Sequence, residues 1–259
     1  MASEAVQTLS SPVEERSAAR KRLAIVPALN EEASVARVVA EIREADPGFD
    51  VVVVDDGSID RTSAVAEGAG ATVLRLPFNL GIGGAVQTGY RYAYENGYSI
   101  AVQVDGDGQH DPDELERLLA PLLAREADVV IGSRFAGAGS YRAQLSRRPG
   151  IRLFAWIVSL VVRKRITDSS SSFRAVNRRA LALFSADYPH GFLETVEATV
   201  LAARSGLRIV EVPVVMRERT EGTSTLTFAR SLWYAAKVLV AVFVSLFRRP
   251  VVHHLEEEP

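Results

Sequence analysis

The sequence predicts an α/β fold in which a mostly parallel, doubly wound sheet carries helices on both faces. Short apolar runs rich in Val and Ile recur along the first half of the chain, as is typical of strands buried on both faces. Helical patterns alternate with these runs through short connections, which indicates right-handed β-α-β units. Polar residues follow the ends of several runs, and such sheets bind ligands at the carboxyl ends of their strands. The sequence therefore predicts one site on one edge of the sheet.

The elements are expected in regular alternation up to about residue 134. The expected strands are apolar runs at residues 22–28, 49–56, 71–76, 98–105 and 127–133. The expected helices lie between them at residues 31–45, 60–70, 84–97 and 112–126.

The pattern changes after residue 134. A basic, loop-like stretch leads to an expected apolar helix at 151–164, and four serines at 169–172 are expected to form a turn. The remaining expected elements are a strand at 207–216 and an apolar or amphipathic helix at 226–248. The expected organisation is a disordered tail at 1–21, one domain at 22–225, the terminal helix at 226–248 and a tail at 249–259.

Length and composition limit the classes of function. A chain of 259 residues fits one large domain with appendages better than two full domains. A formal net charge of −2 excludes a polycationic surface for nucleic acid, so any anion binding must be local. Cysteine is absent, which excludes disulfides, a thiol nucleophile and a thiolate zinc site, and is compatible with the cytoplasm. The first residues lack the apolar core of a secretory signal.

The segment VDGDGQHDPDEL, which follows the fourth apolar run, indicates a metal site. Asp105 and Asp107 alternate in an extended segment, so their side chains point the same way. Two carboxylates suit a hard divalent cation, Mg²⁺ or Mn²⁺, that keeps positions open for phosphate oxygens and water. Gly106 between them leaves room for a bulky ligand, Gln109 flanks the pair, and His110 is expected to be a structural neighbour. The alternative is a solvated charge cluster that caps the next helix.

Two further segments indicate nucleotide binding. DDGSIDRT ends the second strand with Asp55 and Asp56, which could accept hydrogen bonds from a ring N–H or a ribose hydroxyl. NLGIGGAVQTGY places three glycines, Gly83 among them, before a helix, where backbone amides can approach a phosphate or sugar closely.

Arginines supply the expected counter-charge for a diphosphate. Arg134 follows the fifth strand, and Arg147 and Arg148 lie in the basic loop. Arginine pairs with phosphate in a bidentate manner, so we assign this role to Arg134 and to one of the two loop residues. The alternative is a solvated basic loop.

Seven motifs occur in one order between about residue 22 and residue 226. They are IVPALNEE, VVVVDDGSIDRT, NLGIGGAVQTG, VQVDGDGQHDPDEL, DVVIGSRF, DSSSSFRAVNRRAL and EVPVVMRERTEGTSTL. Together they resemble the family 2 glycosyltransferases, and within them the polyprenyl-phosphate sugar synthases, the group that contains dolichol-phosphate mannose synthase. The resemblance implies a GT-A fold and an inverting transfer from a UDP- or GDP-sugar that uses Mg²⁺ or Mn²⁺.

The resemblance also implies roles for individual residues. The base and ribose would be held by Pro27, Leu29, Glu31 and Asp56. The metal would be surrounded by Asp105, Asp107 and Gln109. The donor or acceptor phosphate would contact Arg134 and Arg148, which together with Asp107 would serve catalysis. The acceptor phosphate would lie near Arg219 and Ser224, which match the family's R-x-x-G-x-S segment.

The chain departs from the family pattern at three places. The family often has an aromatic residue where Leu29 stands. It commonly reads D-P-T-S-G-F-R where this chain has DSSSSFR, so a proline and a glycine are missing. It often has S-K where this chain has Ser224 and Thr225, which removes a phosphate-binding lysine.

The expected reaction is transfer of a hexose or N-acetylhexosamine from a nucleotide sugar to a polyprenyl phosphate. A phosphate monoester has a second pKa of about 6, so this acceptor is anionic at neutral pH and needs no strong general base. One alternative is transfer to a sugar hydroxyl in cell-wall or polysaccharide synthesis, for which Asp111 or Glu197 would be the bases to test. Another is a noncatalytic, membrane-associated nucleotide-binding module.

The expected terminal helix is apolar around most of its circumference. Such a helix packs against its own domain or another subunit, or it lies in a membrane interface. Lys237, Arg230, Arg248 and Arg249 flank the apolar surface, as suits anionic headgroups. Its apolar stretch is shorter than the ~20 residues that a membrane span needs. We therefore expect a cytoplasmic protein attached peripherally to the cytoplasmic face of the membrane, with a homo-oligomer as the alternative.

Overall fold

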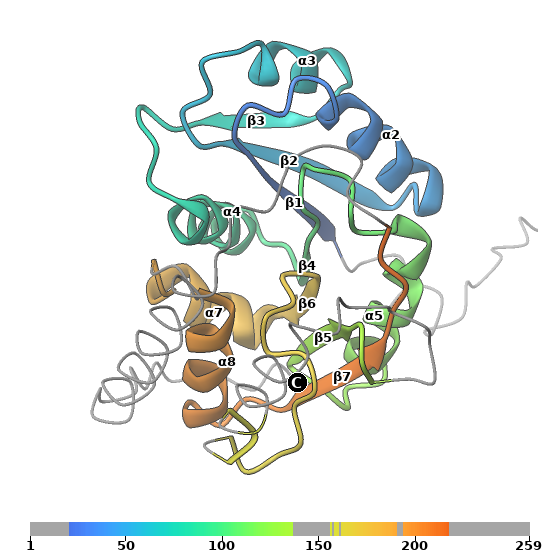
Figure 1. Cartoon of the computed structure of the whole chain (residues 1–259), viewed down its shortest axis with the longest axis vertical. Coiled ribbons are helices and arrows are strands. Elements are labelled where there is room, and N and C mark those ends of the chain that lie inside the picture. The colour runs from blue at the N-terminus through green and yellow to red at the C-terminus, as the bar shows by residue number, and fades with distance from the viewer. Residues whose placement is uncertain (1–20, 137–155, 157, 161, 191–193, 218–259) are drawn as a thin grey trace, which may run out of the picture.

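The structure, a computed structural model, describes residues 21–136, 156, 158–160, 162–190 and 194–217 (Figure 1). Within these residues seven strands form one sheet in the order β3-β2-β1-β4-β6-β5-β7. The strands are β1 (Arg22–Ala28), β2 (Phe49–Asp55), β3 (Thr72–Arg75), β4 (Ile100–Gln103), β5 (Val129–Ser133), β6 (Arg174–Asn177) and β7 (Ile209–Pro213). Only β6 runs antiparallel to its neighbours, so the predicted mostly parallel sheet is confirmed.

Helices cover both faces of this sheet (Figure 1). One face carries α2 (Val35–Ala45), α3 (Thr62–Gly68) and α5 (Leu115–Leu123), the last preceded by the 3₁₀ turn η1 (Pro112–Glu114). The other face carries α4 (Ile82–Glu95), α7 (Arg178–Ala186) and α8 (Glu194–Arg204). Because side chains alternate along a strand, Ala24 and Val26 of β1 face the first layer, while Leu23 and Ile25 face the second.

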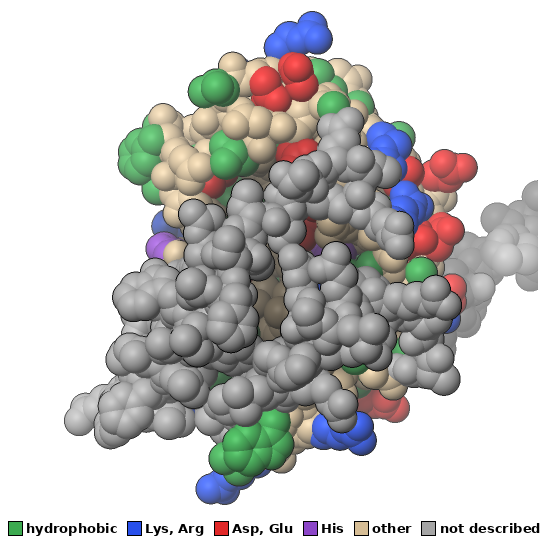
Figure 2. All heavy atoms as spheres, in the orientation of Figure 1, with side chains coloured by type: hydrophobic (Ala, Val, Ile, Leu, Met, Phe, Trp, Pro, Cys, Tyr) green, Lys and Arg blue, Asp and Glu red, His purple; other side chains and the backbone are tan. Residues whose placement is uncertain are grey.

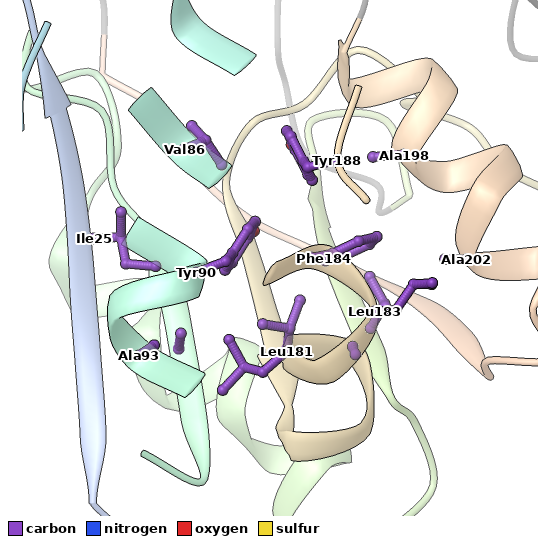
Figure 3. Packing of buried hydrophobic residues seen from close by; sticks show 14 of the residues in the cluster. Ile25, Val86, Tyr90, Ala93, Leu181, Leu183, Phe184, Tyr188, Ala198 and Ala202 are labelled. Carbon is purple, nitrogen blue, oxygen red and sulfur yellow. The ribbon is translucent and has the colours of Figure 1, made fainter. Parts of the chain in front are cut away.

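The core beneath α4 and α7 contains a cluster of aromatic rings (Figure 3). Tyr90 of α4 lies 5.4 Å from Phe184 of α7 and 5.4 Å from Tyr188, measured between ring centroids. Phe184 and Tyr188 meet edge to face at 5.3 Å. Aromatic pairs at such distances contribute about 0.5–1.5 kcal/mol beyond the burial of their surface. These contacts fix the helix that follows the glycine segment against the C-terminal half of the domain.

The structure differs from the sequence prediction chiefly at residues 165–206, where only the serine turn was expected and the structure has β6, α7 and α8. The predicted turn among the four serines is present at residues 169–170, and residues 156, 158–160 and 162 are helical within the predicted helix at 151–164. The predicted terminal helix and both predicted tails, apart from residue 21, lie outside the described residues. Among the helices of the described part of the chain, none combines the length and the hydrophobicity that crossing a membrane requires.

Candidate active site

The carboxyl ends of β1, β2 and β4 open onto a cavity of about 240 Å³ in front of the N-terminus of α4. It is lined by Pro27, Ala28, Leu29, Glu31, Asp56, Asn79, Gly81, Ile82, Ala85, Asp105, Gly106 and Asp107. This volume lies a little below the range of about 300–1,000 Å³ that is usual for small-molecule sites. The described residues therefore form a small cavity at the edge of the sheet that the sequence predicts.

Apolar side chains border the entrance to this cavity. Leu29 and Ile82 line it while each remains 41% exposed. Phe78 and Leu80, in the loop between β3 and α4, are also exposed, and the space-filling view shows apolar side chains gathered over this loop (Figure 2). Exposed apolar side chains beside a polar cavity suit the flat face of a base. Leu29 and Ile82 therefore give the cavity an apolar border.

Asp105 and Asp107 lie just after β4, from which Val104 separates them, and both line the cavity. Gly106 between them packs so closely on β1 that an added β-carbon would lie 3.1 Å from the carbonyl oxygen of Pro27. The Ser34 hydroxyl, at the start of α2, lies 2.7 Å from the carbonyl oxygen of Gly106 and holds this turn in place. The two carboxylates are therefore presented from a backbone that is fixed on two sides.

The carboxylate oxygens of this pair suit a hard divalent cation such as Mg²⁺ or Mn²⁺. In the part of the chain that the structure describes, no three His, Asp or Glu side chains gather into a complete metal site. A cation held by two carboxylates alone would keep positions open for the diphosphate of a donor, which is how Mg²⁺ is commonly bound at phosphate sites. The donor set present thus fits a metal that the substrate helps to hold.

Hydrogen bonds hold Asp105 from several sides. Its Oδ2 accepts from the Ser172 hydroxyl at 2.6 Å, and its Oδ1 accepts from Gln103 Nε2 at 3.2 Å. Its backbone N–H donates to Nδ1 of His110 at 3.0 Å. The His110 ring is buried and stacks on Phe173 with 4.5 Å between ring centroids. His110 therefore supports the loop, as the sequence predicts.

Gln109 turns its backbone into the same loop. Its N–H donates to Oδ1 of Asp107 at 3.0 Å, and its carbonyl oxygen accepts from the N–H of Arg217 at 2.9 Å. Arg217 also pairs with Glu41 at 2.6 Å and with Asp111 at 3.0 Å. Gln109 does not line the described cavity, so its predicted contact with the metal stays a prediction. Because Asp111 is paired with Arg217, it is a poor candidate for a general base.

The two acids at the end of β2 have separate positions. Asp56 lines the cavity, and its oxygens accept from the backbone N–H groups of Leu80 at 2.7 Å and Gly81 at 3.0 Å. Asp55 does not line the cavity. It is buried and accepts from the Ser58 N–H at 2.8 Å and from the Ser63 hydroxyl. Of the two acids, only Asp56 therefore lines the cavity, and Asp55 anchors the turn after β2.

Gly83 also lies away from the cavity lining. A β-carbon at this position would lie 2.3 Å from the carbonyl oxygen of Pro189, so the glycine lets α4 approach the segment after α7. Gly81 and Ile82 line the cavity in its place. The glycine segment therefore borders the cavity, but through Gly81 and Ile82 and not through Gly83.

Pro27 and Glu31 are two of the residues that the resemblance assigns to the base and ribose. Both line the cavity, and the Glu31 N–H donates to the Thr62 hydroxyl at 2.8 Å. The Ser34 hydroxyl lies 2.8 Å from the Glu31 carboxylate and 2.7 Å from the carbonyl oxygen of Gly106, so these two acceptors share its single proton. The loop after β1 is thus tied to α3 and to the turn between the two aspartates.

Arg134 lies at the end of β5 and forms a bidentate ion pair. Its Nε and one Nη donate to the two oxygens of Asp168, each at 2.7 Å, while Asp168 is fully buried. Glu211 of β7 in turn accepts from the backbone N–H groups of Thr167 and Asp168. The guanidinium is therefore held in a fixed orientation with its side chain 21% exposed. Its predicted contact with a phosphate stays a prediction.

Three predicted residues lie outside the described residues, namely Arg148, Arg219 and Ser224. Conversely, the sequence reasoning missed Asp168, Ser172 and Glu194. The DSSSSFR segment marked the place of the first two as a departure from the family pattern. Glu194, at the start of α8, is only 6% exposed, and burial raises its pKa to about 7. The negative charges of Asp105 and Glu197 contribute to this increase. The residues around Glu194 in the sequence gave no sign of this burial.

Comparison with known proteins gives consistent results. Residues 23–184 match the model of the family described as glycosyl transferase family 2. The chain is 36% identical over 216 residues to an undecaprenyl-phosphate mannosyltransferase of Micrococcus luteus, covering 79% of this chain and 87% of that protein. It is 32% identical over 217 residues to a polyprenol monophosphomannose synthase of Mycolicibacterium smegmatis, covering 80% and 82%.

A solved structure shares the fold. Glucosyl-3-phosphoglycerate synthase of Mycobacterium tuberculosis, in complex with Mn²⁺, UDP and phosphoglyceric acid, matches with a TM-score of 0.65 and 23% identity. The match covers 89% of this chain and 81% of that one.

Proposed function

Because the chain belongs to glycosyl transferase family 2 and is a glycosyltransferase, we propose that it transfers a hexose or an N-acetylhexosamine from a UDP- or GDP-sugar to a polyprenyl phosphate. The relatives from Micrococcus luteus and Mycolicibacterium smegmatis carry names that describe mannosyl transfer to such lipids. Mannose is therefore the first sugar to test, and GDP and UDP donors are both to be tried.

The observation that carries this proposal is the cavity between β1, β2 and β4, with Asp105 and Asp107 on its wall. In this proposal Asp56 and Glu31 bind the nucleoside, with Leu29 and Pro27 against the base. Asp105 and Asp107 hold Mg²⁺ or Mn²⁺, together with Gln109. The cation, when bound, would neutralise charge on the diphosphate leaving group.

Arg134 has a second electrostatic role in the proposal. Its guanidinium is held at the same edge of the sheet by Asp168, so its orientation does not have to be established when the donor binds. Preorganised charge of this kind stabilises the developing diphosphate. Arg148 is proposed to add to it from the basic loop.

The acceptor supplies its own nucleophile, because a phosphate monoester is already anionic at neutral pH. Arg219 and Ser224 are proposed to bind this phosphate. Residues 226–248 are proposed to attach the protein peripherally to the cytoplasmic face of the membrane, where the lipid acceptor lies. A subunit contact is the alternative for this segment.

The experiment is a screen of donors and acceptors with the purified full-length protein. GDP-mannose, UDP-glucose and UDP-N-acetylglucosamine are each incubated with Mn²⁺ or Mg²⁺ and with undecaprenyl phosphate, a sugar acceptor or neither. Released nucleotide and the mass of the product are measured, with Asp107→Ala as the inactive control. We expect one donor to give nucleotide release that depends on undecaprenyl phosphate. Release that depends only on the sugar acceptor would support the hydroxyl alternative, and no release under any condition would support a noncatalytic module.

A further inference from the structure

Ser172 occupies an unusual position in the loop before β6. In the family pattern D-P-T-S-G-F-R, the residue before the phenylalanine is glycine, whereas this chain has Ser172 before Phe173. The Ser172 hydroxyl donates to Oδ2 of Asp105 at 2.6 Å, which is a short hydrogen bond to a charged acceptor. A glycine at this position has no side chain that could make the contact.

His110 completes a three-residue arrangement around this carboxylate. Because Nδ1 of His110 accepts from the Asp105 N–H, the neutral ring carries its proton on Nε2. Nε2 lies 3.4 Å from the Ser172 oxygen and 3.6 Å from Oδ2 of Asp105. The ring is buried against Phe173, so it cannot turn away. The N–H of the ring thus points toward the oxygen of Ser172, and the hydroxyl proton of Ser172 is directed to Asp105.

We propose that Ser172, supported by His110, is a positioning residue that fixes the Asp105 carboxylate in the orientation in which it binds the divalent cation. The proposal rests on the proposed function, since it concerns the same metal site. Asp105 is 29% exposed, so its carboxylate would have room to rotate without such a contact. Partners of metal-binding carboxylates orient their ligands, and their removal typically costs 10–100-fold in metal affinity.

The alternative role for the Ser172 hydroxyl is that it competes with the cation for Oδ2 of Asp105. A carboxylate oxygen has two lone pairs, so one hydrogen bond leaves it able to bind a cation. Gln103 contacts the other oxygen from the strand itself, at 3.2 Å. The two contacts act on different oxygens and so restrain rotation of the carboxylate rather than covering it. Positioning therefore predicts weaker metal binding when Ser172 is removed, and competition predicts tighter binding.

The neighbouring serine provides a matched control. Ser171 is buried, and its hydroxyl has no hydrogen-bond partner among the residues that the structure describes. Ser171→Ala therefore removes a hydroxyl from the same loop without removing a contact. Ser172→Thr retains the hydroxyl, while Ser172→Ala removes it and Ser172→Gly restores the residue common in the family.

The test measures Mn²⁺ binding to the full-length protein by electron paramagnetic resonance of the free ion, with UDP present. Thermal unfolding without metal first establishes that each variant is folded. We expect Ser172→Ala and Ser172→Gly to bind Mn²⁺ about tenfold more weakly than the unaltered protein. Ser172→Thr and Ser171→Ala should bind it as the unaltered protein does.

Several results would overturn the inference. Equal or tighter binding by Ser172→Ala would do so, as would an equal loss in Ser171→Ala, which would indicate a general disturbance of the loop. If the unaltered protein binds no Mn²⁺ in the presence of UDP, the metal assignment of the proposed function fails and the inference fails with it. If the unaltered protein binds Mn²⁺ and all variants match it, the proposed function stands and only the role of Ser172 is refuted.

Discussion

Glu194→Gln is predicted to remove a pH-dependent contribution to the stability of the fold. Glu194 is 6% exposed at the start of α8, and burial raises its pKa from 4.5 to about 7. Asp105 and Glu197 act in the same direction, whereas Arg174 opposes them. A folded-state pKa above the unfolded value means that the folded protein binds more protons between these two values. The stability from this group is therefore full below about pH 4.5 and is lost as the pH rises through 7.

The magnitude follows from the size of the pKa change. One pKa unit corresponds to about 1.4 kcal/mol, so the change from 4.5 to about 7 corresponds to on the order of 3 kcal/mol. Glutamine resembles the protonated carboxyl group and does not ionise. The unfolding free energy of Glu194→Gln, relative to that of the unaltered protein, should therefore increase by roughly 2–3 kcal/mol as the pH rises from 5 to 8.

Urea unfolding at pH 5, 6, 7 and 8, followed by circular dichroism, measures this difference. The control is Glu116→Gln, because Glu116 is an exposed glutamate in the first turn of α5. Its difference from the unaltered protein should not change over the same pH range. If the curves of Glu194→Gln and the unaltered protein remain parallel from pH 5 to pH 8, the reasoning about the buried carboxyl is refuted.

Three further substitutions address the site. Asp107→Ala should abolish the Mn²⁺ dependence of UDP binding while leaving the circular dichroism spectrum unchanged, and calorimetric titration with and without Mn²⁺ checks this; an unchanged metal dependence would contradict the assignment. Asp168→Asn leaves Arg134 without its buried partner and should cost about 3 kcal/mol in urea unfolding, whereas a cost near zero would show that the pair is not a stabilising contact. Gly106→Val should abolish UDP binding, because its side chain would be forced against Pro27 at the cavity wall; retained affinity in calorimetry would show that the donor does not use this cavity.

The strands of the first half could be predicted because both faces of the sheet are covered. β1, β2, β4 and β5 therefore consist almost entirely of buried apolar residues, which form a pattern visible in the sequence. β6 lacks such a pattern, since only its two middle residues are apolar and a charged and a polar residue stand at its ends. Arg174 is nevertheless buried, with its guanidinium donating to the carbonyl oxygens of Ser169 and Ser171. Such contacts with a preceding turn cannot be deduced from residue type.

The candidate site likewise contains residues that could be located from the sequence and residues that could not. Asp105 and Asp107 could be located because their position depends only on the end of a strand, and the parallel sheet then brings them to one edge. The partners of the site could not be located in this way. Asp168 meets Arg134 across 34 positions of the sequence, and Ser172 meets Asp105 across 67. Contacts at such separations depend on the insertion of β6, which the sequence pattern did not show.

The place of β6 in the sheet has a consequence for how the chain folds. β6 lies between β4 and β5, although it follows both in the sequence. Strands β1 to β4 can associate as they leave the ribosome, but β4 then keeps an unpaired edge, and both neighbours of β5 come later in the chain. Such edges invite pairing with other chains until they are covered. The late arrival of β6 also makes the closing contacts non-local, which slows folding. Synthesis at low temperature or with chaperones should therefore raise the soluble yield of this protein, and fragments that end before β6 should aggregate.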